Sequence, residues 1–174
     1  MPMHHQLATI YRTIIFGALA IASALPHSAA AKERTTNADR AFLAWDIQIE
    51  IQQQDMGHLA EKRARTPQVR DLGRYLVERH QQMQQRLQQV ADQLGISLSH
   101  QLSELHLRVQ RHYATIPDAG FDGAFVRHEI GDYHYFLSHF EAAATSGTGL
   151  VKTYAASEIP QLKEDQSKIT ALPH

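Results

Sequence analysis

The stretch PQVRDLGRYLVERHQQMQQRLQQVADQL, residues 67–94, decides how the rest of the sequence is interpreted. Its apolar residues recur at spacings of three and four, which predicts one long amphipathic helix. These apolar residues are Val69, Leu72, Leu76, Met83, Leu87, Val90 and Leu94. His80 lies on the same face, within about 40° of its centre when each residue turns by about 100°. We therefore expect the His80 imidazole to be buried and to meet side chains from other helices.

Helical periodicity along the whole sequence predicts an all-α fold, a four-helix bundle with one short extra helix. We expect the long helices at residues 37–64, 67–94, 121–145 and 149–169, and the short one at residues 102–113. Neither a strand pattern nor a glycine-rich phosphate loop is present. The inward positions of the other three long helices are Phe42, Trp45, Ile49, Met56, Leu59 and Ala60, then Val126, Ile130, Tyr133, Leu137, Phe140 and Ala144, and finally Val151, Tyr154, Ala155, Leu162 and Ile169.

The connections between these helices predict the topology. Thr66 suits a helix N-cap and Pro67 the first helical position, so the first two helices should form an antiparallel pair. Gly95 suits the end of the second helix, and Thr148 suits the cap of the last. The connection that contains the short extra helix has about 25 residues, which permits a crossover between two antiparallel pairs, as in ferritin-like bundles.

Residues 1–31 have the pattern of a secretory signal peptide. Residues 14–25 (IIFGALAIASAL) form a short apolar run, and the small residues that follow suit cleavage after Ala31 or close by. The run is too short for a comfortable membrane span, so we expect no stable span after signal removal. The alternative is an uncleaved N-terminal anchor. The sequence contains no cysteine, and we expect one domain over residues 32–174, located in the periplasm.

The charge balance argues against nucleic acid as a partner. The whole sequence has 17 Lys and Arg against 18 Asp and Glu, for a net charge of −1. Removal of residues 1–31 takes away only Arg12, so the mature chain carries 16 basic and 18 acidic residues and a net charge of −2. A nucleic-acid binder needs a basic surface, which this composition does not provide.

Several polar side chains fall on the inward faces of the predicted helices. They are Gln53, His80, Glu129, Tyr133, Glu158 and Asp165. Buried acids are costly unless they are paired, hydrogen-bonded or bound to metal. One interpretation is a metal site for iron, manganese or zinc made by His80, Glu129, Tyr133 and Asp165, with Gln53 and Glu158 as polar neighbours. The other is a hydrogen-bonded network in which His80 meets Glu129 or Asp165 and Tyr133 donates.

The pattern of a carboxylate-bridged di-iron centre is not met. Such bundles place a Glu on each of two helices and Glu-x-x-His on each of the other two, all facing inward. No Glu-x-x-His motif faces this core, and the first helix offers the neutral amide of Gln53. The remaining histidines of the third long helix are predicted on its flank or outer side. His128 and Asp132, four residues apart, are therefore interpreted as a solvated pair, or as a weak surface chelate.

Four short motifs resemble those of a secreted bacterial family of unknown function, DUF4142, a ferritin-like four-helix domain. Residues 57–60 (GHLA) are similar to its Leu-Gly-x-Leu-Ala motif, and residues 76–80 (LVERH) to its Met-Val-x-Asp-His motif. Residues 121–125 (FDGAF) resemble Phe-Asp-x-Ala-Tyr, and residues 159–162 (IPQL) resemble Leu-Pro-x-Leu. Their order and spacing cover nearly the whole mature chain.

This chain departs from the family pattern at three polar positions. Tyr133 replaces the second recurrent histidine, Asp165 replaces the histidine of the last helix, and Gln53 replaces the glutamate of the first. Of the recurrent histidines, only His80 is retained. The resemblance implies no activity that can be transferred, and these changes weaken any metal site that the family has.

The sequence therefore predicts a periplasmic helical protein that is a non-enzymatic envelope or stress-associated binding protein. The first alternative is a metal-binding protein with a degenerate core site centred on His80. The second is a structural module that forms a homodimer through Ile47 and Ile51, which are predicted to face away from the main apolar stripe. Neither an enzymatic reaction nor a specific ligand follows from the residues.

Overall fold

The computed structural model describes residues 34–174, which form five helices. Their bounds are α1 (Asn37–Arg63), α2 (Pro67–Leu94), α3 (Glu104–Thr115), α4 (Asp118–Ser146) and α5 (Gly149–Thr170). No strand is present in this part of the chain, so the all-α prediction is confirmed. None of the helices described here is apolar over a length sufficient to cross a membrane. The predicted signal peptide, residues 1–31, lies outside the described residues.

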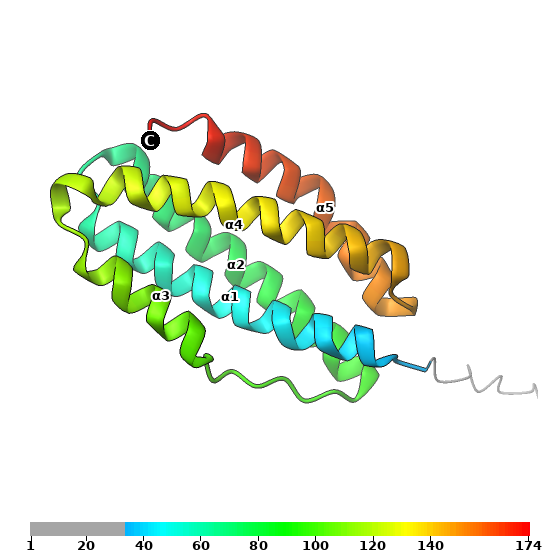
Figure 1. The fold of residues 1–174 in the computed structure, drawn as a ribbon. Helices are drawn as coiled ribbons and strands as arrows, with labels where there is room; N and C mark the ends of the chain where they lie inside the picture. Colours follow the sequence, from blue (N-terminus) through cyan, green and yellow to red (C-terminus); the bar gives the residue numbers. More distant parts are fainter. Residues whose placement is uncertain (1–33) are drawn as a thin grey trace, which may run out of the picture. The chain divides into compact units, whose positions relative to one another are not determined.

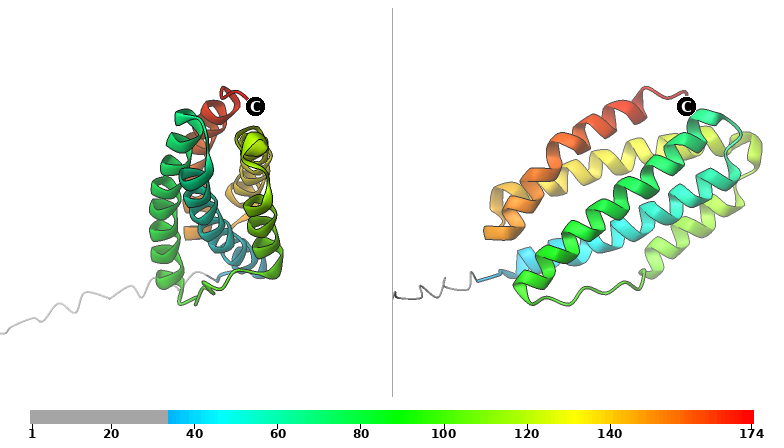
Figure 2. Two further views of the ribbon diagram at one scale, coloured as in Figure 1. Left: turned by 90° about the vertical axis from the view of Figure 1, so that its left-hand side faces the viewer. Right: turned by 180° about the vertical axis from the view of Figure 1, so that it is seen from behind.

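The helices are arranged as two antiparallel pairs, α1 with α2 and α4 with α5 (Figure 1). The connection that contains α3 carries the chain back along the bundle, so that α2 and α4 run in the same direction (Figures 1 and 2). In each view α1 lies between α2 and α3, and α3 packs on α1. The extra helix in the crossover connection is confirmed.

Local hydrogen bonds explain where α1 and α2 begin and end. Thr36 caps α1, and Asp39 bonds back to the Thr36 backbone N–H, completing a capping box. The Thr66 hydroxyl accepts a bond from the Val69 backbone N–H, and Pro67 occupies the first turn of α2. Gly95 ends α2 with a φ of 69°, a left-handed conformation that favours glycine. Both the start of α2 at Pro67 and its end at Gly95 are as the sequence predicts.

Two glycines allow α1 and α2 to approach closely. A Cβ atom added at Gly57 would lie 2.6 Å from the carbonyl oxygen of Gly73, and one added at Gly73 would lie 2.6 Å from that of Gly57. A real Cβ cannot tolerate either distance. The absence of both side chains therefore sets the separation of the two backbones near the middle of α1.

The core contradicts part of the predicted orientation of α1. Ile47, predicted to face outward, is only 1% exposed and belongs to the hydrophobic core, while Ile51 is partly buried against it. Phe42 and Trp45, predicted as central, are only partly buried. The physical reason is that the centre of the bundle is polar along α1. The helix therefore turns its carboxylates and amides inward and leaves two of its aromatic rings at the edge.

Two further predictions need correction near α4 and α5. Helix α4 begins at Asp118, three residues earlier than predicted, because Pro117 occupies the N-cap position. Thr148 does lie at the N-cap of α5, but its side chain makes no capping bond. Its hydroxyl and backbone N–H instead donate to the Asp39 carboxylate, at 2.6 and 3.0 Å, and tie the start of α5 to the start of α1.

Candidate functional site

His80 lies at the centre of the bundle and is held from two sides. Its Nδ1 atom lies 2.8 Å from Oε2 of Glu50 on α1, and its Nε2 atom lies 3.0 Å from the hydroxyl of Tyr133 on α4. All three side chains are fully buried. The prediction that His80 is buried is confirmed, and so is its contact with Tyr133. Glu50, its other partner, was not predicted from the sequence.

Glu50 forms part of a buried pair of carboxyl groups with Asp46, one helical turn earlier. Burial raises the pKa of both groups, and the charge of Glu50 raises the pKa of Asp46 further. Asp46 Oδ2 accepts a 2.8 Å hydrogen bond from the hydroxyl of Tyr154 on α5. The other oxygens, Asp46 Oδ1 and Glu50 Oε1, are buried without another partner among the described residues. One proton shared between the two carboxyl groups satisfies both oxygens.

The protonation of His80 sets the direction of these hydrogen bonds. Burial, and then the nearby charge of Arg79, lower the pKa of His80 to about 3, so the imidazole is neutral near pH 7. In the tautomer that fits, Nδ1–H donates to Glu50 and Nε2 accepts from the Tyr133 hydroxyl. Asp46, which holds the proton of the pair, then donates to Glu50. The result is a continuous chain of hydrogen bonds from Tyr133 to Asp46.

A second buried cluster surrounds Arg79 on α2. Its guanidinium donates to Asp165 Oδ2 at 3.1 Å and to Glu158 Oε2 at 3.0 Å, both on α5. Arg86 also donates to Glu158, and the Tyr75 hydroxyl donates to Asp165. The acids Glu158 and Asp165 are thus neutralised by arginine, which is the usual condition for burying carboxylates.

A third cluster lies between α1, α4 and α3. Gln53 donates to Asp132 Oδ2 at 3.1 Å, and burial raises the pKa of Asp132 to about 7. Burial also raises the pKa of Glu129, and neither of its carboxyl oxygens has a hydrogen-bond partner among the described residues. His128 Nε2 lies 3.4 Å from Asp132.

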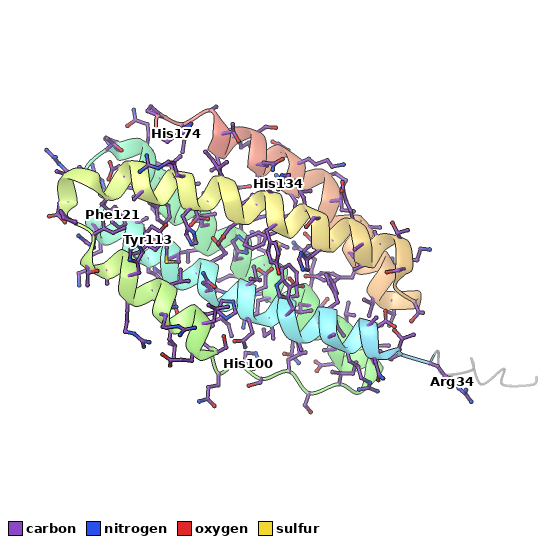
Figure 3. The ribbon with its side chains drawn as sticks, viewed as in Figure 1. Arg34, His100, Tyr113, Phe121, His134 and His174 are labelled. Carbon is purple, nitrogen blue, oxygen red and sulfur yellow. The ribbon has the colours of Figure 1, made fainter. Side chains whose placement is uncertain are left out.

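His128 corrects the prediction that this part of α4 is solvated. The Tyr113 ring of α3 stacks on the imidazole with 4.6 Å between the ring centroids, and Figure 3 shows Tyr113 beside α4. Burial, with the charge of His112 as the next cause, lowers the pKa of His128 to about 4. The sequence-based prediction failed because the extra helix covers a face of α4 that would be open in a bundle without it.

The lining of one surface cavity is mainly apolar. This cavity, of about 410 Å³, lies between the first turns of α1, the last turns of α4 and the start of α5. Its walls are Ala38, Asp39, Ala41, Phe42, Trp45, His139, Ala142, Ala143, Ser146, Gly147 and Val151. A second cavity, of about 630 Å³ between α2 and α5, is lined by polar and charged side chains that include Arg79, Arg86 and Glu158.

A family model described as a domain of unknown function (DUF4142) matches residues 24–172, which is most of the chain. The protein belongs to the DUF4142 family. No curated protein and no solved structure matches the sequence.

The predicted site residues of the DUF4142 domain are divided among the three clusters. His80 and Tyr133 contact each other, whereas Asp165 and Glu158 belong to the Arg79 cluster, and Glu129 and Gln53 lie in the cluster of Asp132. Sequence reasoning missed the acids Asp46 and Glu50 and the counter-ion Arg79. A signal for the two acids was available, since positions 46, 50 and 53 follow the four-and-three spacing of one helix face.

The donor atoms do not converge on a metal position. Both ring nitrogens of His80 are engaged, and Asp165 accepts bonds from Tyr75, Arg79 and Gln161. Among residues 34–174, no group of three or more His, Cys, Asp or Glu side chains has the geometry to hold a metal ion. The predicted set of His80, Glu129, Tyr133 and Asp165 is thus divided among the three clusters of this structure.

Proposed function

We propose that this DUF4142 protein is an exported, non-enzymatic binding protein of the bacterial envelope. We propose further that its ligand is a small uncharged apolar molecule held beside Trp45. The observation that supports this function is the cavity of about 410 Å³ between α1, α4 and α5. Its volume is within the usual range of small-molecule sites, and its walls are mostly alanine and aromatic side chains.

The charges around this cavity favour an uncharged ligand. Its only carboxyl group, Asp39, is already bonded to Thr36 and Thr148, and no lysine or arginine belongs to the lining. His139 Nδ1 lies 3.0 Å from the backbone oxygen of Tyr135, so a neutral imidazole donates there and leaves Nε2 as an acceptor. A flat apolar ligand with one N–H or O–H donor would match these walls.

Trp45 allows binding to be measured directly, because it is the only tryptophan in the sequence and it lines the cavity. The mature protein is titrated with N-phenyl-1-naphthylamine, an uncharged aromatic amine, while Trp45 emission is recorded. We expect saturable quenching. Ala142→Phe should abolish it, because this exposed alanine lines the cavity and a phenyl ring there would fill the space.

The matched control is Ala156→Phe, which places the same ring at an exposed alanine of α5 outside the cavity. This variant should bind the probe as the wild type does. Failure of the wild type to quench at the solubility limit of the probe would contradict the proposal. Equal affinity in the wild type and Ala142→Phe would contradict it as well.

Export is tested separately from binding. Expression of the whole chain in a Gram-negative host, followed by fractionation and intact-mass measurement, should yield a periplasmic protein that begins at or near Lys32. The expectation comes from the signal-peptide pattern of residues 1–31. Recovery of the full-length chain from the cytoplasm would contradict export, and recovery of the full-length chain from the membrane would indicate an uncleaved anchor.

Metal binding is the second candidate function, and one observation favours it. Glu129 is fully buried and both of its carboxyl oxygens are without a hydrogen-bond partner among the described residues. A cation near Glu129 would offset that cost. Elemental analysis of protein purified from the periplasm should find stoichiometric iron, manganese or zinc if this candidate is correct, with loss of the metal in Glu129→Gln. Protein that is free of metal after dialysis against each ion would contradict it.

The dimer alternative required both Ile47 and Ile51 at the surface, but Ile47 packs inside the domain. Ile51 is the remaining residue of the proposed contact, and it is only partly buried. Light scattering should show a dimer that Ile51→Glu disrupts if this surface is an interface. A monomeric wild type would contradict the alternative.

A further inference from the structure

Tyr133 is a phenol with a base in place to take its proton. Its ring is fully buried, and its hydroxyl donates to His80 Nε2 at 3.0 Å. Burial raises the pKa of this phenol well above its ordinary value, so the group keeps its proton in the resting protein. Behind the imidazole, Glu50 and Asp46 continue the hydrogen bonds to the Tyr154 hydroxyl.

A series of aromatic rings joins Tyr133 to the surface. The centroid of Phe136 lies 5.4 Å from that of Tyr133 and 6.2 Å from that of Trp45. Trp45 lies in turn 5.9 Å from Tyr135, whose side chain is 50% exposed, and stacks on His139 at 4.5 Å. Electrons can cross such short gaps between rings, whereas protons cannot, because proton transfer needs hydrogen-bonded neighbours.

We propose that Tyr133, His80 and Glu50 form a redox relay that stores one oxidising equivalent delivered to Trp45 or Tyr135 at the surface. The oxidant is a one-electron acceptor, such as a peroxyl radical formed in the envelope. The activity goes beyond ligand binding at the apolar cavity and does not depend on it, although Trp45 takes part in both.

One electron leaves Tyr133, passes through Phe136 and Trp45, and reduces the oxidant by one electron. The O–H bond of Tyr133 breaks, and its proton forms a bond to His80 Nε2 while the Nδ1 proton moves to Glu50. A neutral phenoxyl radical remains on Tyr133, and the peroxyl radical becomes a peroxide anion that takes a proton from water.

The carboxyl pair provides the end of the proton pathway. With one proton shared between Asp46 and Glu50, the pair carries one negative charge in the resting state. The proton that reaches Glu50 cancels that charge. Transfer along hydrogen bonds of 2.8–3.0 Å thus avoids leaving an imidazolium ion in the dry core, where burial disfavours it.

The relay is tested by electron paramagnetic resonance after flash oxidation with a ruthenium(III) polypyridyl complex, which accepts one electron at the protein surface. The wild type should give a long-lived tyrosyl signal. Tyr133→Phe should lose that signal, and Trp45→Phe should form it more slowly. His80→Gln keeps a polar side chain that cannot take the proton, and should give a lower yield and no solvent-deuterium effect on the rate.

Two controls distinguish this inference from the alternatives. Tyr113→Phe removes a tyrosine outside the path and should leave the signal unchanged, as should Ala156→Phe, which places a phenyl ring at an exposed alanine of α5 outside the cavity. In the wild type, high-field spectra should show the lowered g value of a phenoxyl that accepts a hydrogen bond, a measurement that needs no variant. A signal that persists in Tyr133→Phe, or a g value of a phenoxyl without a hydrogen bond, would overturn the proposal.

Discussion

Glu50 Oε2 lies 2.8 Å from His80 Nδ1, and no part of either side chain reaches solvent. Glu50→Ala should lower the free energy of unfolding by about 3 kcal/mol, because it leaves a buried N–H without an acceptor and opens a cavity. Glu50→Gln keeps an acceptor and should lose about 1 kcal/mol. Urea unfolding of the three proteins checks the order. Equal losses in the two variants would show that the hydrogen bond contributes nothing.

Arg79 should be the most costly arginine of α2 to remove. Arg79→Met leaves Glu158 and Asp165 buried beside fewer positive charges, and we expect a loss of about 3–5 kcal/mol in the free energy of unfolding. The matched control is Arg74→Met, because Arg74 pairs with Asp71 at the surface, where such pairs are worth about 0–1 kcal/mol. Both values come from the same denaturant titration. Similar losses would contradict the importance of burial here.

The close contact of α1 with α2 predicts opposite effects for two glycine substitutions. Gly73→Ala places a Cβ 2.6 Å from the carbonyl oxygen of Gly57, so the helices must separate, at a cost of about 1–3 kcal/mol. Gly131 is an exposed position of α4, and a Cβ added there meets nothing within 4 Å. Gly131→Ala should therefore raise the free energy of unfolding by about 1 kcal/mol through helix propensity. Thermal unfolding of both variants measures the signs, and a stabilised Gly73→Ala would contradict the contact.

Asp132 should make stability fall as the pH rises towards neutrality. Its ordinary pKa is 3.8, whereas burial raises the folded-state pKa to about 7. Between these values the folded state binds more protons than the unfolded state, so the free energy of unfolding decreases with increasing pH. This contribution is present below pH 4 and is lost by about pH 7.

Asp132→Asn removes this titrating carboxyl group. As the pH rises from 4 to 7, the free energy of unfolding of the variant should therefore increase relative to that of the wild type, by roughly 2–4 kcal/mol. The charge of Asp132 also raises the pKa of Glu129, so the difference between the two curves reports on Asp132 together with its effect on Glu129. Chemical unfolding at several pH values supplies both curves. A difference that does not change with pH would indicate an ordinary pKa for Asp132 in the folded protein.

Local sequence signals predicted the helices well. The range of α2 matches the predicted residues 67–94, because apolar periodicity, Thr66 with Pro67, and Gly95 all act within a few residues. The antiparallel α1–α2 pair follows from the same short turn. The existence of α3 was also predictable, since its own apolar spacing is helical.

The inward face of α1 was not predictable from hydrophobicity alone. Seven of its eleven buried positions follow a four-and-three spacing through Asp39, Leu43, Asp46, Glu50, Gln53, Gly57 and Ala60, and four of these seven are polar. A search for apolar residues therefore selects a neighbouring face that contains Phe42 and Trp45. The polar face becomes acceptable only when His80 and Tyr154 from other helices satisfy it.

The sequence by itself determined the all-α class, the two ends of α2, the crossover with its extra helix, and the burial of His80, because each depends on short-range spacing. The tertiary structure decided which groups meet. In the folded protein His80 bonds to Glu50 and Tyr133. Asp165 accepts a hydrogen bond from Arg79, and the Tyr113 ring stacks on His128. Side chains that are distant in the sequence come within hydrogen-bond reach only through the rotation and separation of packed helices, which helical periodicity does not specify.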